Sequence, residues 1–146
     1  MLLPRALAIK GIVPSKTTVY SFKNSEYDSS APAHLHIVIP INDSDYVLLT
    51  MITSQVEKRK GYYAHNPKAL ASVIDIEKDD LDLIRKESVI DCNKPLYQTR
   101  EELATIISGD IEYIDVSIPD ELIDRIKVGI VNSPLVKPII KKSIEI

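Results

Sequence analysis

The sequence has little of what a covalent framework, a phosphate loop or a membrane span requires. Its single cysteine among 146 residues excludes an internal disulfide framework and fits a reducing compartment. The four glycines are scattered, so the chain has no Gly-rich phosphate loop and no nucleophile elbow. No segment approaches the roughly 18 apolar residues of a membrane span, and residues 1–10 are too short and interrupted for a secretory signal. We therefore expect a cytoplasmic protein that does not bind a membrane.

Length and charge describe an ordinary globular chain with an uneven charge distribution. The composition is 45% hydrophobic and 27% charged with a formal net charge of -3, and 146 residues are enough for one domain with a proper core. Residues 1–60 hold seven Lys/Arg against five Asp/Glu, residues 61–132 hold eight against fifteen, and residues 133–146 hold three against one. An anionic partner is therefore expected at the first or the last of these segments. The middle segment is equally consistent with a solvated acidic face that has no partner.

Short runs of β-branched and aromatic residues predict a mainly β fold. We expect strands over residues 17–22, 34–40, 46–53, 70–76 and 87–92. The last run ends in Cys92, which we interpret as a buried core thiol and not as a nucleophile, because free cysteine is among the most buried residue types. Polar segments at residues 23–32 and 57–67 separate the strands. The pattern is typical of a small, bent antiparallel sheet or β-barrel with appended helices.

Two segments in the second half carry helix-start signals. Thr99 and Glu102 match a capping box, in which a hydroxyl and a carboxylate satisfy each other's free backbone N–H groups. A short helix through residue 107, ended at Gly109, is expected to follow. Residues 117–121 open a second helix with a proline and acids in its first turn. Its apolar residues have helical spacing, namely Leu122, Ile123, Ile126 and Ile130. The tail, residues 133–146, is expected to be an edge strand or a loose extension.

Two histidines at the start of one strand are the first candidates for chemistry. Strand alternation places His34 and His36 on the same face of the strand at 34–40, where two imidazoles can act as an acid/base pair. They are equally consistent with polar residues at a sheet edge. A metal site, and with it a metal-dependent hydrolase, is disfavoured because His65 stands alone in a loop and no dense carboxylate cluster lies near by in sequence.

The end of the next strand and the segment after it combine hydroxyls, amides, cations and aromatics. Thr53 ends that strand, where a hydroxyl can hold phosphate oxygens or make a local hydrogen bond at a hairpin end. Basic residues interleaved with tyrosines can hold phosphates and stack bases, although a solvated charged loop has the same composition. The candidate residues for holding phosphates and stacking bases of a nucleic-acid strand are Ser54, Gln55, Lys58, Arg59 and Tyr62.

The order of these runs resembles the PemK/MazF-type toxins of bacterial toxin–antitoxin systems. The resemblance covers roughly residues 17–132 and lies chiefly in three runs, residues 34–39, 52–55 and 88–94. It implies an SH3-like barrel of PemK/MazF type with a C-terminal helix, which forms a homodimer, binds an antitoxin protein and cleaves single-stranded RNA without a metal or another cofactor. The chain is then a single domain over residues 1–146, with an N-terminal extension at 1–16, the barrel and helix at 17–132, and a tail at 133–146.

One departure from the family concerns the catalytic arginine. The family has an Arg-Pro pair leading into the first of those strands, where this sequence has His34-Leu35-His36, while Thr53 matches the hydroxyl position of the next strand. The resemblance therefore implies that His36 or His34 serves as general base or acid and that Thr53 polarises the scissile phosphate. Lys58 and Arg59 would hold the flanking phosphates. The alternative is a non-catalytic SH3-like barrel that binds a protein or nucleic acid, encoded by a mobile element.

Overall fold

The computed structural model describes residues 16–24, 33–41 and 44–144, without the side chains of residues 24 and 108–110. By its internal contacts the chain divides into two compact units, each described here by itself. Unit 1 consists of Met1–Leu49 and Leu96–Asp115, and unit 2 of Thr50–Pro95 and Val116–Ile146. The predicted N-terminal extension and the polar loop at 25–32 lie outside the described residues, apart from Lys16. The assignment of residues 1–146 to a single domain stays a prediction.

The described residues of unit 1 form a group of antiparallel strands with one short helix. Its elements are β1 (Thr18–Asn24), β2 (His34–Pro40), the first half of β3 (Tyr46–Thr53), β6 (Leu96–Thr99), α4 (Arg100–Ile106) and β7 (Ile107–Ile114). Strand β1 lies between β2 and β7, so that Val19 pairs with Ile37 on one side and Ile114 on the other. Strand β6 pairs with the first half of β3. The core of this unit is apolar and includes Phe22, Val38 and Leu103.

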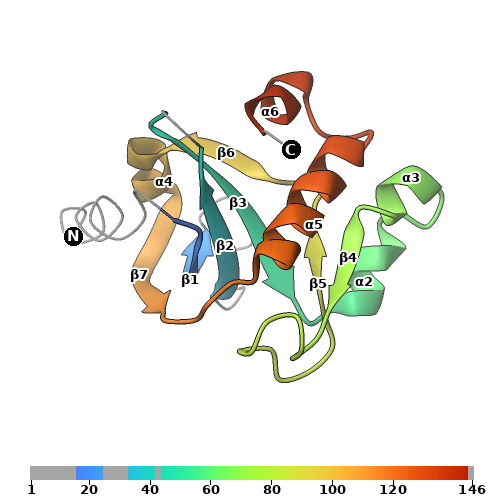
Figure 1. Cartoon of the computed structure of the whole chain (residues 1–146), viewed down its shortest axis with the longest axis horizontal. Helices are drawn as coiled ribbons and strands as arrows, with labels where there is room; N and C mark the ends of the chain where they lie inside the picture. The colour runs from blue at the N-terminus through green and yellow to red at the C-terminus, as the bar shows by residue number, and fades with distance from the viewer. Residues whose placement is uncertain (1–15, 25–32, 42–43, 145–146) are drawn as a thin grey trace. The chain divides into compact units, whose positions relative to one another are not determined.

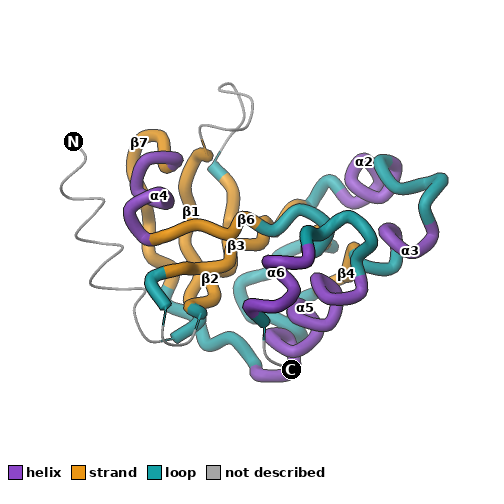
Figure 2. Tube along the Cα trace, turned by 90° about the horizontal axis from the view of Figure 1, so that it is seen from above, coloured by secondary structure: helices purple, strands orange, loops and turns teal. Residues whose placement is uncertain are grey.

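Unit 2 combines a small antiparallel sheet with four helices. Its elements are the end of β3, α2 (Val56–Gly61), α3 (Pro67–Leu70), β4 (Val73–Ile76), β5 (Ser88–Asp91), α5 (Asp120–Asn132) and α6 (Pro138–Ser143). Strand β5 is central, because Ile90 pairs with Ile52 of β3 and with Ile74 of β4. Figure 1 shows these elements in green, yellow and red, and Figure 2 shows α5 alongside β4.

The fold class is mainly β with appended helices, as the sequence predicts. Seven antiparallel strands form an open sheet, in the order β4-β5-β3-β2-β1-β7 with β6 paired to β3. Both units therefore take part of the same strand, β3. The pairings among the described residues are those of an open sheet, and closure into an SH3-like barrel stays a prediction.

The capping box is confirmed, but the helix that it starts ends earlier than predicted. The Thr99 hydroxyl accepts a hydrogen bond from the Glu102 N–H at 3.1 Å, and the Glu102 carboxylate accepts one from the Thr99 N–H at 2.8 Å. Helix α4 ends at Ile106, and residues 107–114 form β7 against β1. The predicted helix end at Gly109 is therefore wrong. Gly109 and Asp110 are typical of a turn, and only pairing with a distant strand makes this segment extended.

The second predicted helix is confirmed, and the tail is corrected. Helix α5 starts at Asp120 after the cap residue Pro119 and ends at Asn132, with Leu122, Ile126 and Ile130 buried. The tail forms helix α6 instead of an edge strand or a loose extension. Pro138 at the start of α6 and basic residues in its last turn both favour a helix. The polar segment at 57–67 likewise contains most of α2.

Helix α5 approaches β5 closely at one residue, Gly129. A Cβ atom at Gly129 would lie 2.9 Å from the Sγ atom of Cys92, which is less than real Cβ contacts allow. Cys92 is buried as predicted, and burial raises the pKa of its thiol to about 12. The Gly129 carbonyl also accepts a hydrogen bond of 2.7 Å from the Ser72 hydroxyl. The small size of residue 129 therefore determines how closely this helix packs within unit 2.

We predict that Gly129→Ala lowers the free energy of unfolding by about 1–3 kcal/mol, because the added methyl group overpacks the contact with Cys92. Gly61→Ala is the matched control, since nothing lies within 4 Å of a Cβ at that helical position. It is expected to leave stability unchanged or to raise it by up to about 1 kcal/mol. Urea unfolding of both variants checks the prediction, and equal effects of the two substitutions would contradict it.

Candidate functional site

The two candidate histidines lie at the start of β2 in unit 1, and one of them belongs to the core. His36 is 1% exposed and stacks on Phe22, with ring centroids 4.0 Å apart and an angle of 11° between the planes. Its Nδ1 atom donates a hydrogen bond to the backbone carbonyl of His34 at 2.9 Å. The other ring nitrogen, Nε2, is buried and has no hydrogen-bond partner among the described residues. His34 is half-buried.

The surroundings of His36 keep its ring neutral. Burial lowers the pKa of His36 from its ordinary value to about 4, because the charged imidazolium loses its hydration in the core. A neutral ring has the protonation state of a general base, but a ring this buried does not reach an RNA strand. Its packing against Phe22 favours a structural role. The assignment of His36 and His34 as acid and base stays a prediction.

Thr53 ends β3 in unit 2 and starts the polar segment that leads into α2. Its side chain is buried, and its hydroxyl oxygen accepts a hydrogen bond from the Gln55 N–H at 3.2 Å. This is the local bond expected of a hydroxyl residue at a hairpin end. Ser54 and Gln55 are exposed. The histidines thus belong to unit 1, whereas Thr53 and the predicted RNA-binding residues belong to unit 2.

One predicted RNA-binding residue on α2, Arg59, lies against an exposed aromatic ring, that of Tyr62. Tyr62 is 55% exposed, the largest such value among the described tyrosines. The guanidinium carbon of Arg59 lies 4.9 Å from the centre of its ring, and the ammonium group of Lys94 lies 5.3 Å from it. Lys58 is exposed on the same short helix. We call the residues Lys58, Arg59, Tyr62 and Lys94 the Tyr62 face.

A buried carboxylate behind the Tyr62 face holds Arg59 in place. Asp91 is 4% exposed, and its Oδ2 atom accepts hydrogen bonds from the Tyr63 hydroxyl at 2.7 Å and from Arg59 at 3.5 Å. Its Oδ1 atom accepts from the backbone and side-chain N–H groups of Asn93 at 3.0 and 3.1 Å. Burial, and then the bond to Asp91, raise the pKa of Tyr63 well above its ordinary value. Tyr63 therefore remains a neutral donor to the carboxylate.

Most residues of the Tyr62 face could be predicted from the sequence, but Lys94 and Asp91 could not. Lys94 follows the predicted strand at 87–92, and its place in an Asn-Lys-Pro turn gave no sign of which residues it faces. Only the pairing of β5 with β3 brings that turn to the residues of α2. Lys60, by contrast, is paired with Asp75 at 2.8 Å. The two lysines of α2, Lys58 and Lys60, therefore differ in their availability to a ligand.

In residues 16–24, 33–41 and 44–144, no three His, Cys, Asp or Glu side chains are grouped as metal ligands. None of the helices in these ranges is long and apolar enough to cross a membrane. The sequence matches no protein-family model, and neither a curated protein nor a solved structure matches it. A proposal for the function of the protein therefore rests on the contacts of the Tyr62 face.

We predict that the buried ring of His36 makes the protein less stable in acid. Its pKa of about 4 in the folded state lies below the ordinary value, so the unfolded chain binds more protons below pH 6.5. The contribution of the neutral His36 ring to the free energy of unfolding is fully present above pH 6.5 and is lost as the pH falls towards 4. The loss is about 3 kcal/mol, because a tenfold change in proton affinity corresponds to about 1.4 kcal/mol.

Urea unfolding of the wild type and of His36→Leu between pH 7 and pH 4 measures this contribution. The variant should lose less stability over that range than the wild type does. His65→Gln is the control, because His65 is exposed and its replacement should leave the pH dependence unchanged. An identical acid dependence in the wild type and His36→Leu would contradict the prediction.

Proposed function

We propose that this protein binds single-stranded RNA on the Tyr62 face of unit 2. The observation that supports this proposal is the exposed ring of Tyr62 with two cations, Arg59 and Lys94, at 4.9 and 5.3 Å from its centre. An exposed aromatic ring offers a surface on which an unpaired base can stack, and the cations beside it can hold the phosphates on either side of that base. A double helix would not present an unstacked base to such a ring.

The surroundings of Tyr62 match the same chemistry. Lys58 on α2 and Lys94 after β5 are exposed, and the described residues show no ion pair for either one. Ser54 and Gln55 are exposed just before α2, and they offer hydroxyl and amide groups to phosphate or sugar. Arg59 is tied to Asp91, which restricts its guanidinium to the neighbourhood of the ring. A site that is already ordered before binding loses less side-chain entropy when the strand arrives.

We predict that Tyr62→Ala weakens binding of a fluorescent single-stranded RNA by about 5- to 100-fold, because stacking contributes about 1–3 kcal/mol per base. Fluorescence anisotropy at fixed salt measures the change. Tyr113→Ala is the matched control, since Tyr113 is also an exposed tyrosine but belongs to unit 1. Equal affinities of wild type and Tyr62→Ala would exclude stacking on this ring.

We predict that Lys94→Gln lowers the salt dependence of RNA binding. Each phosphate contact that is lost should reduce the slope of log K against log salt by about 0.7 for a single strand. Lys78→Gln is the control, because Lys78 is an exposed lysine of unit 2 outside the Tyr62 face. The same slope for Lys94→Gln and wild type, from titrations at several salt concentrations, would show that Lys94 does not contact a phosphate.

A second candidate function is cleavage of the bound strand, as in a toxin-like endoribonuclease. It is supported by the resemblance and by the place of the Thr53 hydroxyl, which ends β3 three residues before α2. That hydroxyl accepts one hydrogen bond, from the Gln55 N–H, and in this proposal it would donate its own proton to a phosphate oxygen. In this proposal Thr53 would polarise the scissile phosphate of the bound strand.

We predict that purified protein cleaves a mixed single-stranded RNA at low salt in the presence of chelator. Thr53→Val should reduce the cleavage rate by about 10²- to 10³-fold, the usual effect of removing one donor to a developing charge. Thr105→Val is the control, because Thr105 is exposed on α4 in unit 1. If the wild-type protein binds the RNA but leaves it intact, the nuclease function is excluded and the RNA-binding proposal stands. A toxin would also require a neighbouring gene whose antitoxin product relieves its toxicity.

A further inference from the structure

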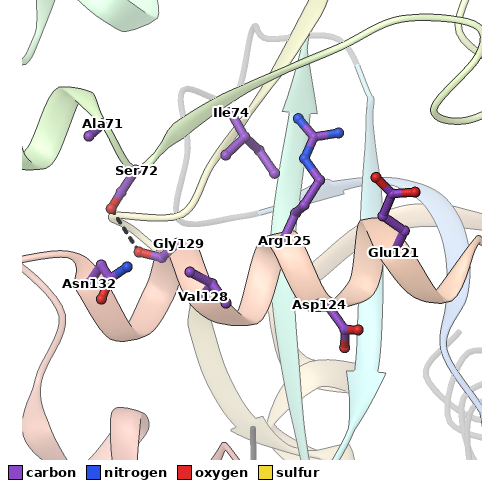
Figure 3. A pocket seen from close by; sticks show the side chains of 9 residues that line it. All are labelled: Ala71, Ser72, Ile74, Glu121, Asp124, Arg125, Val128, Gly129 and Asn132. Carbon is purple, nitrogen blue, oxygen red and sulfur yellow. Dashed lines mark hydrogen bonds between the residues drawn. The ribbon is translucent and has the colours of Figure 1, made fainter.

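A groove unrelated to the Tyr62 face lies along α5 in unit 2. It has a volume of about 630 Å³, within the range of about 300–1,000 Å³ that is usual for ligand sites. Figure 3 shows its lining side chains on α5, on β4 and on the turn before β4. The lining residues are Ala71, Ser72, Ile74, Glu121, Asp124, Arg125, Val128, Gly129 and Asn132.

The groove combines apolar side chains with free negative charge. Val128 is 42% exposed, and Ile74 lines the opposite wall. Glu121 and Asp124 are exposed, and neither has an ion pair within the described ranges. Arg125 is already engaged, since it binds the Asp80 carboxylate at 3.0 Å and the Asp75 carbonyl at 2.9 Å. The charge left to attract a ligand is therefore negative, which disfavours RNA here and favours a cationic, partly apolar partner.

Helix α6 of the same chain presents the complementary chemistry. Ile139 is 66% exposed and Leu135 is 50% exposed, the two largest values among the described Leu and Ile side chains. Lys141 and Lys142 lie in the last turn of α6, and the described part of the chain shows no ion pair for either. No residue of α6 lines the groove of its own chain. In the described part of a single copy, α6 thus presents an exposed isoleucine and two lysines that form no ion pair.

We propose that α6 of a second copy docks in this groove, with Ile139 against Ile74 and Val128 and with Lys141 and Lys142 facing Glu121 and Asp124. Each copy has both the groove and α6, so a two-fold dimer forms this contact twice. The apolar contact supplies binding energy, and the opposite charges select the orientation. The proposal does not depend on RNA binding, because it uses none of the residues of the Tyr62 face.

Sedimentation velocity over a concentration series of the full chain tests the proposal. Wild type should dimerise, and Glu121→Lys/Asp124→Lys or Lys141→Glu/Lys142→Glu should each raise the dimer dissociation constant at least about tenfold. The variant with all four substitutions restores opposite charges and should recover most of the affinity. Asp79→Lys/Asp82→Lys is the matched control, since it makes the same charge change at exposed residues outside the groove. It should leave the dimer unchanged.

Several results would overturn the proposal. A chain that is monomeric up to about 1 mM, or a dimer that neither charge-reversed pair weakens, would exclude this contact. Thermal unfolding checks that each variant is folded. If a charge-reversed pair fails to fold, Ile139→Ser tests the apolar contact instead, because Ile139 is exposed. A dimer unaffected by Ile139→Ser would also exclude the contact.

Discussion

The arrangement of unit 2 depends on satisfying one buried carboxylate, that of Asp91. A charge removed from water costs several kcal/mol unless partners replace its hydration. Here the partners are Tyr63, Asn93 and Arg59, and they come from the segment after α2, the turn after β5 and α2 itself. Asn93 is bound in turn by the Ser133 hydroxyl at 2.6 Å, next to the end of α5. Arg59, which Asp91 binds directly, and Lys94 lie at 4.9 and 5.3 Å from the centre of the exposed Tyr62 ring.

In unit 1, the buried polar ring of His36 is accommodated differently. His36 has one hydrogen bond, a stacked neighbour in Phe22, and a second nitrogen without a partner among the described residues. A neutral imidazole is much less costly to bury than a charge, so the core tolerates it at neutral pH. The same arrangement removes the ring from solvent. The acid–base role that the sequence suggests for His36 therefore falls on a buried ring in unit 1, whereas the exposed Tyr62 face belongs to unit 2.

Local signals predicted part of the fold, and non-local pairing decided the rest. The capping box at Thr99 and the apolar spacing of α5 are short-range patterns, and both are confirmed. Strand β7 is not visible in this way, because Gly109 and Asp110 are typical of a turn and become extended only against β1. Helices α2 and α6 are short and polar on most sides, so no helical spacing of apolar residues predicts them from the sequence.

The sequence by itself determined the mainly β class, the starts of α4 and α5, the burial of Cys92 and the basic, tyrosine-containing character of α2. Each of these follows from residue types or from spacing within one segment. Tertiary structure alone decided that Lys94 joins Arg59 beside Tyr62, that His36 lies in the core, and that α5 and β4 enclose a groove with an acidic rim. The physical reason is that burial and contact depend on which distant segments pair, and residue type constrains that choice only weakly.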